Sequence, residues 1–172
     1  MKQKGFTLIE LLVVISVIGL LAAVVLVAMN STRSKARNAR RNADIKQLVT
    51  AFNLGLSSSN FLPLNAGGVW ACVSSSCYGG WSTYVANVPV DAFLATYISK
   101  PSDPQDSSRG EGGYAYYNVY AGTTSGYDGY VFPVGAYLYW SVELPVNSSS
   151  CGIGRIKDVS GSNYIECLFK ID

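Results

Sequence analysis

One carboxylate stands inside a long apolar run near the start of this chain. From Phe6 to Met29 the only charged residue is Glu10, and the flank before the run carries Lys2 and Lys4. An apolar run of this length crosses a bilayer as a helix, and an acid inside such a span is costly enough to indicate a function. No Lys, Arg or His within the run can pair with Glu10, so its cationic partner has to come from elsewhere.

A cut between Gly5 and Phe6 would create such a partner. The new α-amine of Phe6 would be positive at neutral pH, because the ordinary pKa of an α-amine is about 7.7–8.0. Phe6 and Glu10 are four residues apart in the sequence, so in a helix they share one face. We expect the amine to pair with Glu10 of the same chain or of a neighbouring copy, and the second arrangement would drive assembly.

The residues from Lys4 to Val14 resemble the class III signal of type IV prepilins and of the related pseudopilins. The resemblance implies that a membrane prepilin peptidase cuts after Gly5 and N-methylates Phe6. It also implies that Glu10 helps the subunit to join a growing fibre. The alternative interpretation is an ordinary membrane anchor with a stray acid.

Composition argues against an enzyme. The 172 residues include no His, which removes the commonest metal ligand and the usual general base. The acids beyond the apolar run are spread along the chain without a pair spaced for general acid and base work. We therefore expect no catalytic residue, no cofactor and no metal. The segment Asp158–Asn163 offers oxygen ligands for calcium, but a plain turn is the favoured interpretation.

The four cysteines form two sequence-local pairs, Cys72 with Cys77 and Cys151 with Cys167. An even number of cysteines in an exported domain indicates two disulfides. The sequence leaves all three possible pairings open. Zinc is the alternative use of four cysteines, but the spacings do not match the paired C-x2-C motifs of a zinc ribbon.

The chain divides into five expected segments. Residues 1–5 form a leader peptide, and residues 6–29 form the transmembrane and fibre-core helix. Residues 30–56 continue this helix with one apolar face, and Gly55 with the following serines ends it. Residues 57–113 form a connecting region with a disulfide, a short helix over 90–98 and turns at Pro101 and Asp103-Pro104.

Residues 114–172 are expected to form an antiparallel sheet and a C-terminal disulfide loop. The stretches Tyr114–Tyr120, Tyr137–Leu144 and Tyr164–Ile171 have the two-residue period of strands with one buried face. Leu138, Trp140, Val142 and Leu144 face inward, as do Ile165, Cys167, Phe169 and Ile171. The predicted fold is α+β and pilin-like: a long N-terminal helix packs across three or four antiparallel strands.

The basic residues between Arg33 and Lys46 could contact DNA or lipid headgroups. Neighbouring subunits or water are the favoured surroundings. Counting positive residues on either side of the span would place the C-terminal side in the cytoplasm. The prepilin-like motif and the paired cysteines place it outside instead.

These observations predict a structural subunit of a type IV pilus. Its implied partners are copies of itself in a helical filament, the prepilin peptidase, the pilus assembly machinery and the inner membrane. It would be a single-pass membrane protein before assembly and part of an extracellular pilus afterwards. One alternative is a major pseudopilin of a type II secretion system, which the region around Asp103-Pro104 also resembles. The other is a membrane-anchored binding module that never polymerises.

Overall fold

The computed structural model describes residues 5–65, 68–77, 86–104, 112–122, 126–143, 150–159 and 164–172. The chain splits into two compact units, residues 1–36 and residues 37–172. Helix α1, Leu8–Ser59, contributes to both units.

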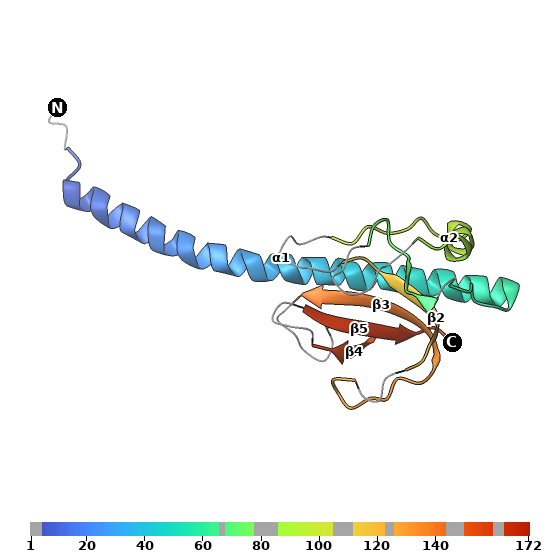
Figure 1. Cartoon of the computed structure of the whole chain (residues 1–172). Helices are drawn as coiled ribbons and strands as arrows, with labels where there is room; N and C mark the ends of the chain where they lie inside the picture. The colour runs from blue at the N-terminus through green and yellow to red at the C-terminus, as the bar shows by residue number, and fades with distance from the viewer. Residues whose placement is uncertain are drawn as a thin grey trace. The chain divides into compact units, whose positions relative to one another are not determined.

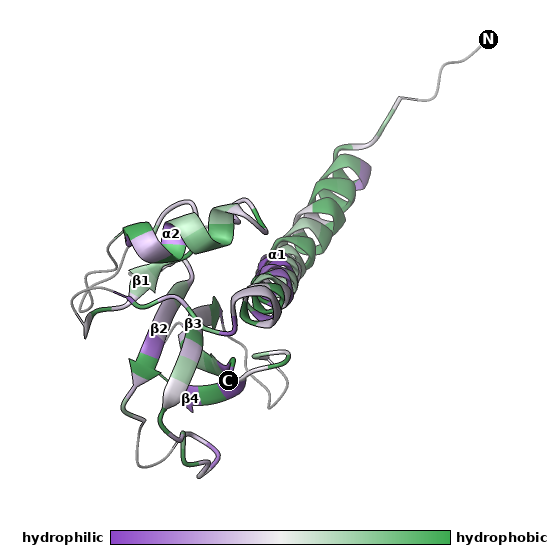
Figure 2. Ribbon diagram, turned by 90° about the vertical axis from the view of Figure 1, so that its right-hand side faces the viewer, coloured by the Kyte–Doolittle hydropathy of each residue, from purple (hydrophilic) through white to green (hydrophobic). Residues whose placement is uncertain are grey.

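The first unit consists of the N-terminal part of α1 and the residues that precede it. Its large apolar side chains are exposed, from 81% of the surface of Leu8 to 45% of that of Met29. Figure 2 shows this part of α1 as an almost continuously hydrophobic ribbon. By length and composition, α1 is the one helix among the described residues that could cross a membrane.

The second unit is built on a five-stranded sheet in the order β1-β2-β3-β5-β4, in which every neighbouring pair is antiparallel. Figure 1 shows the second half of α1 running along this sheet. The central strand β3 pairs with β5 over seven residue pairs, from Tyr137↔Lys170 to Glu143↔Tyr164. The strands are β1 (Ala71–Cys72), β2 (Ala115–Tyr120), β3 (Gly135–Glu143), β4 (Arg155–Asp158) and β5 (Tyr164–Lys170).

The main core lies between the sheet and the apolar face of α1. Helix side chains at offsets of three and four meet the inward side chains of β3 and β5, because helix and strand periods each present one apolar face. This arrangement confirms the predicted α+β class and most of its inward residues. The core includes Ile45, Leu48, Val49, Phe52, Leu138, Trp140, Val142, Ile165 and Cys167.

The opposite side of the sheet is also buried, although sequence alternation predicts an outward face there. Every residue of β3 is buried. Tyr137 and Tyr139 belong to a second apolar cluster with Ala115, Phe132 and Leu168, and Trp70, Tyr120 and Tyr130 pack around it. A Tyr ring can be buried when its hydroxyl finds a partner, and the Tyr137 hydroxyl donates to the Pro133 carbonyl at 2.8 Å.

Helix α1 ends at Ser59 rather than at residue 56. Asn60 has a φ of 58°, the left-handed conformation that commonly follows a helix, and its N–H donates to the Leu56 carbonyl at 2.8 Å. Gly55 therefore does not end the helix. A Cβ at Gly55 would lie 2.0 Å from the Phe93 ring, so this glycine allows a second helix to approach α1 closely.

Helix α2 and two short strands differ from the predicted elements. Helix α2 covers Val88–Ala95, two to three residues earlier than predicted, and the Asn87 side chain caps it. Strands β1 and β4 bring the sheet to five strands instead of three or four. These two strands have two and four residues, too few for a periodic pattern to predict them.

Candidate functional site

The N-terminal motif forms a reciprocal cap at the start of α1. The Thr7 carbonyl accepts the first helical hydrogen bond, from Leu11 N–H at 3.3 Å. The Glu10 N–H donates to Thr7 Oγ1 at 3.4 Å. In return, the Thr7 N–H and hydroxyl donate to Glu10 Oε2 at 2.9 and 2.6 Å. This is the capping box in which a Thr and a Glu three residues later satisfy each other's backbone donors.

The capping box places the Gly5-Phe6 peptide bond outside the helix. Gly5, Phe6 and Thr7 have no helical structure and are exposed, with Phe6 80% accessible. The expectation that Phe6 and Glu10 share a helix face therefore does not hold for the uncut chain, because the helix begins at Leu8. The pattern Thr-x-x-Glu before an apolar run is a known signal for this cap, and sequence reasoning had overlooked it.

The structure selects one of the three cysteine pairings. Cys72 is bonded to Cys77, and Cys151 is bonded to Cys167, with Cα–Cα distances of 5.9 and 5.6 Å. The second bridge joins β5 to the turn before β4 and is fully buried, whereas Cys77 of the first bridge is half-buried.

Two arginines of α1 enter a buried ionic network in the second unit. The Arg41 guanidinium is fully buried and donates to Asp103 Oδ1 at 2.7 Å and to Glu143 Oε1 at 2.7 Å. Arg37 Nε donates to the same Glu143 oxygen at 2.8 Å. The Asn38 amide binds both the N–H and the carbonyl of Glu143. The network thus joins α1 to the end of β3 and to the Asp103-Pro104 segment, to which no turn is assigned.

This network corrects the expected position of the basic cluster. Arg37 and Arg41 were expected to face water or neighbouring subunits, and Glu143 was assigned to the outward face of its strand. Arg37 and Arg41 stand eight and four residues before Ile45, so they continue the apolar face of α1. That spacing was the available signal. Arg40 and Lys46 lie off this face and are exposed.

A second polar contact joins α1 to the first residues of the sheet region. The Tyr114 hydroxyl donates to Asp44 Oδ2 at 2.8 Å. Burial, together with this hydrogen bond, raises the pKa of Tyr114 well above its usual value. Asp44, which interrupts the basic cluster in the sequence, therefore serves the fold.

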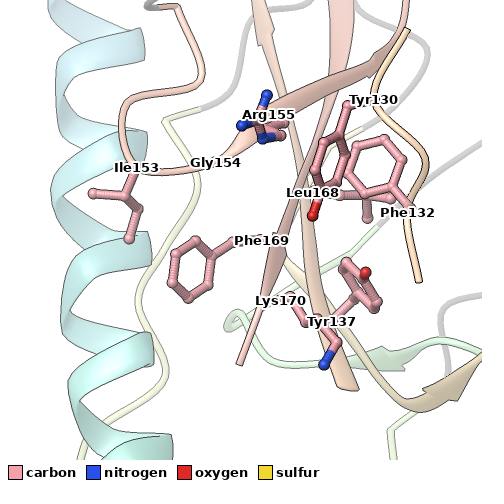
Figure 3. Close-up of a pocket in the computed structure, with 9 residues that line it drawn as sticks. All are labelled: Tyr130, Phe132, Tyr137, Ile153, Gly154, Arg155, Leu168, Phe169 and Lys170. Atoms are coloured by element: carbon pink, nitrogen blue, oxygen red, sulfur yellow. The ribbon is translucent and has the colours of Figure 1, made fainter. Parts of the chain in front are cut away.

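An open pocket of about 160 Å³ lies at β4, β5 and the loop before β3. Figure 3 shows Tyr130, Phe132 and Leu168 gathered on one side of β5 and Phe169 on the side of α1. The Arg155 guanidinium lies 4.1 Å from the centre of the Tyr130 ring and pairs with Asp128 at 3.0 Å. Lys170, also in the lining, pairs with Asp172. Since both cations already have carboxylate partners, the pocket carries no clear chemistry for a substrate.

The described residues show no metal centre. Among them, no group of three or more His, Cys, Asp or Glu could hold a metal ion. Most of the calcium candidate, residues 160–163, lies outside the described residues, although Asp158 is described at the end of β4.

The N-terminal motif is shared with known proteins. Residues 1–26 match the family model described as the prokaryotic N-terminal methylation motif. The chain is 44% identical over 54 residues to the type IV major alpha-pilin of Moraxella bovis, a match that covers 31% of this chain and 34% of the pilin. No solved structure matches the chain.

Two further relatives have longer matches. The chain is 29% identical over 103 residues to the type II secretion system core protein G of Pectobacterium carotovorum subsp. carotovorum, covering 60% of this chain and 62% of the relative. It is 27% identical over 103 residues to the protein of the same name in Escherichia coli (strain K12), covering 56% and 71%. In its methylation motif and in these partial matches, the chain is similar to type IV pilins and to the core proteins G of type II secretion systems.

Proposed function

We propose that the protein is a structural subunit of a type IV pilus, cut between Gly5 and Phe6 and polymerised through its N-terminal helix. One observation carries the proposal: an exposed peptide bond, outside the helix, stands directly before a capped apolar helix whose side chains are exposed. A peptidase can reach that bond without unwinding the helix. The helix itself needs lipid or other helices around it.

Glu10 can bind a new amine without losing its cap. Both bonds from Thr7 end on Oε2, and a carboxylate has about four acceptor positions over its two oxygens. Cleavage would release the positive α-amine of Phe6, and methylation of that amine keeps its charge. Oε1 would then accept the amine of a neighbouring copy, which would fix the axial register of the two subunits.

Assembly would move the helix from lipid into a bundle of like helices. The apolar side chains keep an apolar environment in both places, so their transfer does not expose them to water. The α+β unit would coat the outside of the filament. The subunit would have no catalysis to perform, since the peptidase and the assembly machinery act on it as partners. DNA as a partner has no support beyond the exposed cations Arg33, Lys35, Arg40 and Lys46.

Electron microscopy and mass spectrometry test the proposal together. We expect the parent cells to carry surface fibres, and these fibres should be absent when the gene for this chain is deleted. The subunit from those fibres should lack Met1–Gly5, carry one added methyl group and have four hydrogens fewer for its two disulfides. An uncut mass in the fibres would refute the processing site at Gly5 and Phe6.

A major pseudopilin of a type II secretion system is the second candidate. The 103-residue match to two core proteins G favours it, since that match extends beyond the N-terminal helix. In this case deletion should abolish protein secretion while no long surface fibre is seen in the parent strain.

A membrane-anchored binding module is the third candidate, and a substitution at Glu10 separates it from both fibre-forming candidates. Glu10→Ala should leave such a module active, whereas either fibre subunit should fail to assemble. Asp128→Ala provides the matched control, because this acid lies on the exposed surface of the second unit, where it pairs with Arg155.

A further inference from the structure

The Cys72–Cys77 bridge closes a small ring that contacts two segments distant in the sequence, one at residues 100–101 and one at Tyr114. On one side, Ser75 N–H donates to the Pro101 carbonyl at 2.8 Å, and Lys100 Nζ donates to the Cys72 carbonyl at 2.8 Å. On the other side, Val73 N–H donates to the Tyr114 carbonyl at 2.8 Å. The ring therefore links residues 100–101, just before Asp103, to Tyr114, just before β2.

The same ring supports the backbone at Gly113 and Tyr114. Ser74 Oγ accepts the Tyr114 N–H at 2.9 Å and lies 3.1 Å from Cys77 Sγ. A Cβ at Gly113 would lie 2.7 Å from Cys77 Sγ, and Gly113 has a φ of 96°. The backbone thus packs directly on the disulfide, in a conformation that glycine adopts readily.

Gly113 connects the ring to the buried ionic network. Its N–H donates to Asp103 Oδ2 at 2.7 Å, while Asp103 Oδ1 accepts from Arg41 Nε at 2.7 Å. The contacts run without a gap from the disulfide through Ser74 and Gly113 to Asp103 and α1. Asp103 holds its position because residues on both sides of it are fixed by the ring.

We propose that the Cys72–Cys77 bridge is a redox-sensitive latch that holds Asp103 on Arg41 and is reduced before the Cys151–Cys167 bridge. A dithiol reductant would supply two electrons and two protons. Its thiolate attacks Cys77 Sγ and releases the Cys72 thiolate, and its second thiol resolves the mixed disulfide. The products are two protein thiols and the oxidised cyclic reductant.

Burial sets the order of reduction, since exchange requires a thiolate to reach a sulfur atom. Cys77 is half-buried and follows exposed Ser75 and Ser76, whereas Cys151 and Cys167 are 1% and 0% exposed. Reduction of the latch should release the segment around Asp103 from α1 and leave the paired strands β3 and β5 intact.

The consequence in the cell rests on the proposed function. A pilus subunit would begin in a reducing compartment and finish in an oxidising one. The latch would then close only after export, so the connecting region would reach its final position on the side of the membrane where assembly occurs.

The test is graded reduction of the full-length chain in detergent micelles with dithiothreitol, followed by alkylation and mass spectrometry. We expect Cys72 and Cys77 to be alkylated at least about tenfold faster than Cys151 and Cys167. Hydrogen exchange at the Gly113 and Tyr114 amides should rise about tenfold in the partly reduced protein, while the Val142 and Ile165 amides keep their protection. Equal reduction of both bridges, or unchanged exchange at Gly113, would overturn the proposal.

A substitution in the ionic network gives a reciprocal test. If the bridge supports the contact between Asp103 and Arg41, that contact must support the bridge to the same extent. Asp103→Asn should therefore make the Cys72–Cys77 bridge easier to reduce at equilibrium, and Asp128→Asn should not. An unchanged reduction equilibrium in Asp103→Asn would show that the ring and the network are independent. None of these measurements requires a filament, so failure of the latch and failure of the pilus proposal are distinguishable.

Discussion

Arg41 carries much of the polar connection between α1 and the rest of the second unit. Its buried guanidinium binds two carboxylates, the Asn38 amide oxygen and the Pro104 carbonyl. Removing one partner of a buried ion pair leaves the remaining charges without compensation. The contribution of the network to the free energy of unfolding is therefore measured best by replacing Arg41, its central cation.

We predict that Arg41→Met destabilises the folded state by about 3–5 kcal/mol, because Asp103 and Glu143 would stay buried without their shared donor. Urea unfolding followed by near-ultraviolet circular dichroism measures the change. Arg40→Met is the matched control: Arg40 is exposed one residue away, so its replacement should change stability by less than about 0.5 kcal/mol. Equal effects of the two variants would contradict a structural role for the network.

Single residues also show where sequence reasoning succeeded and where it failed. The special position of Glu10 was readable, because one acid in an apolar run is conspicuous. The spacing of Arg41 from Ile45 indicated an inward position, but its carboxylate partners were not readable, since they stand 62 and 102 residues later in the chain. The choice among three cysteine pairings likewise depends on which residues the fold brings together.

At the scale of elements, periodicity predicted the helix and the longer strands but not the contacts between helices. The apolar offsets along α1 and the alternation in β3 and β5 each follow from one repeated geometry. The close approach of α2 depends instead on one missing side chain, at Gly55. In the sequence this glycine had the features of a helix end, because glycine commonly follows the last helical residue.

We predict that Gly55→Ala destabilises the second unit by about 1–3 kcal/mol, although alanine alone favours a helix by about 0.5–1 kcal/mol over glycine. The new methyl group would meet the Phe93 ring, which stacks on Phe52 with ring centroids 5.6 Å apart. Thermal unfolding measures the effect.

The double variant Gly55→Ala with Phe93→Ala identifies the cause of that loss. If the clash with the ring is responsible, alanine at position 55 should become neutral or stabilising once the ring is removed. A persistent loss in the Phe93→Ala background would place the cause elsewhere in the helix.

Over the whole molecule, the buried tyrosines of the sheet region make the stability of the folded state depend on pH in the alkaline range. Burial raises the pKa of Tyr137 to about 12, and it raises the pKa values of Tyr114 and Tyr116 well above their usual value. In the unfolded chain all three hydroxyls lose their protons near the ordinary value of 10. Above that pH the folded state binds more protons than the unfolded state, so stability falls as pH rises.

We therefore predict that these three tyrosines make a constant contribution to the free energy of unfolding below about pH 10. Between about pH 10 and 12 the free energy of unfolding should fall by up to about 1.4 kcal/mol per pH unit for each of them. Urea midpoints measured across this range, with tyrosinate absorbance on the same samples, check the slope. Tyr137→Phe should remove about one third of it. Tyr127→Phe should leave it unchanged, because Tyr127 is 67% exposed. A flat profile up to pH 12 would contradict the raised pKa values of the buried Tyr114, Tyr116 and Tyr137, because it would mean that their hydroxyls ionise as readily as in the unfolded chain.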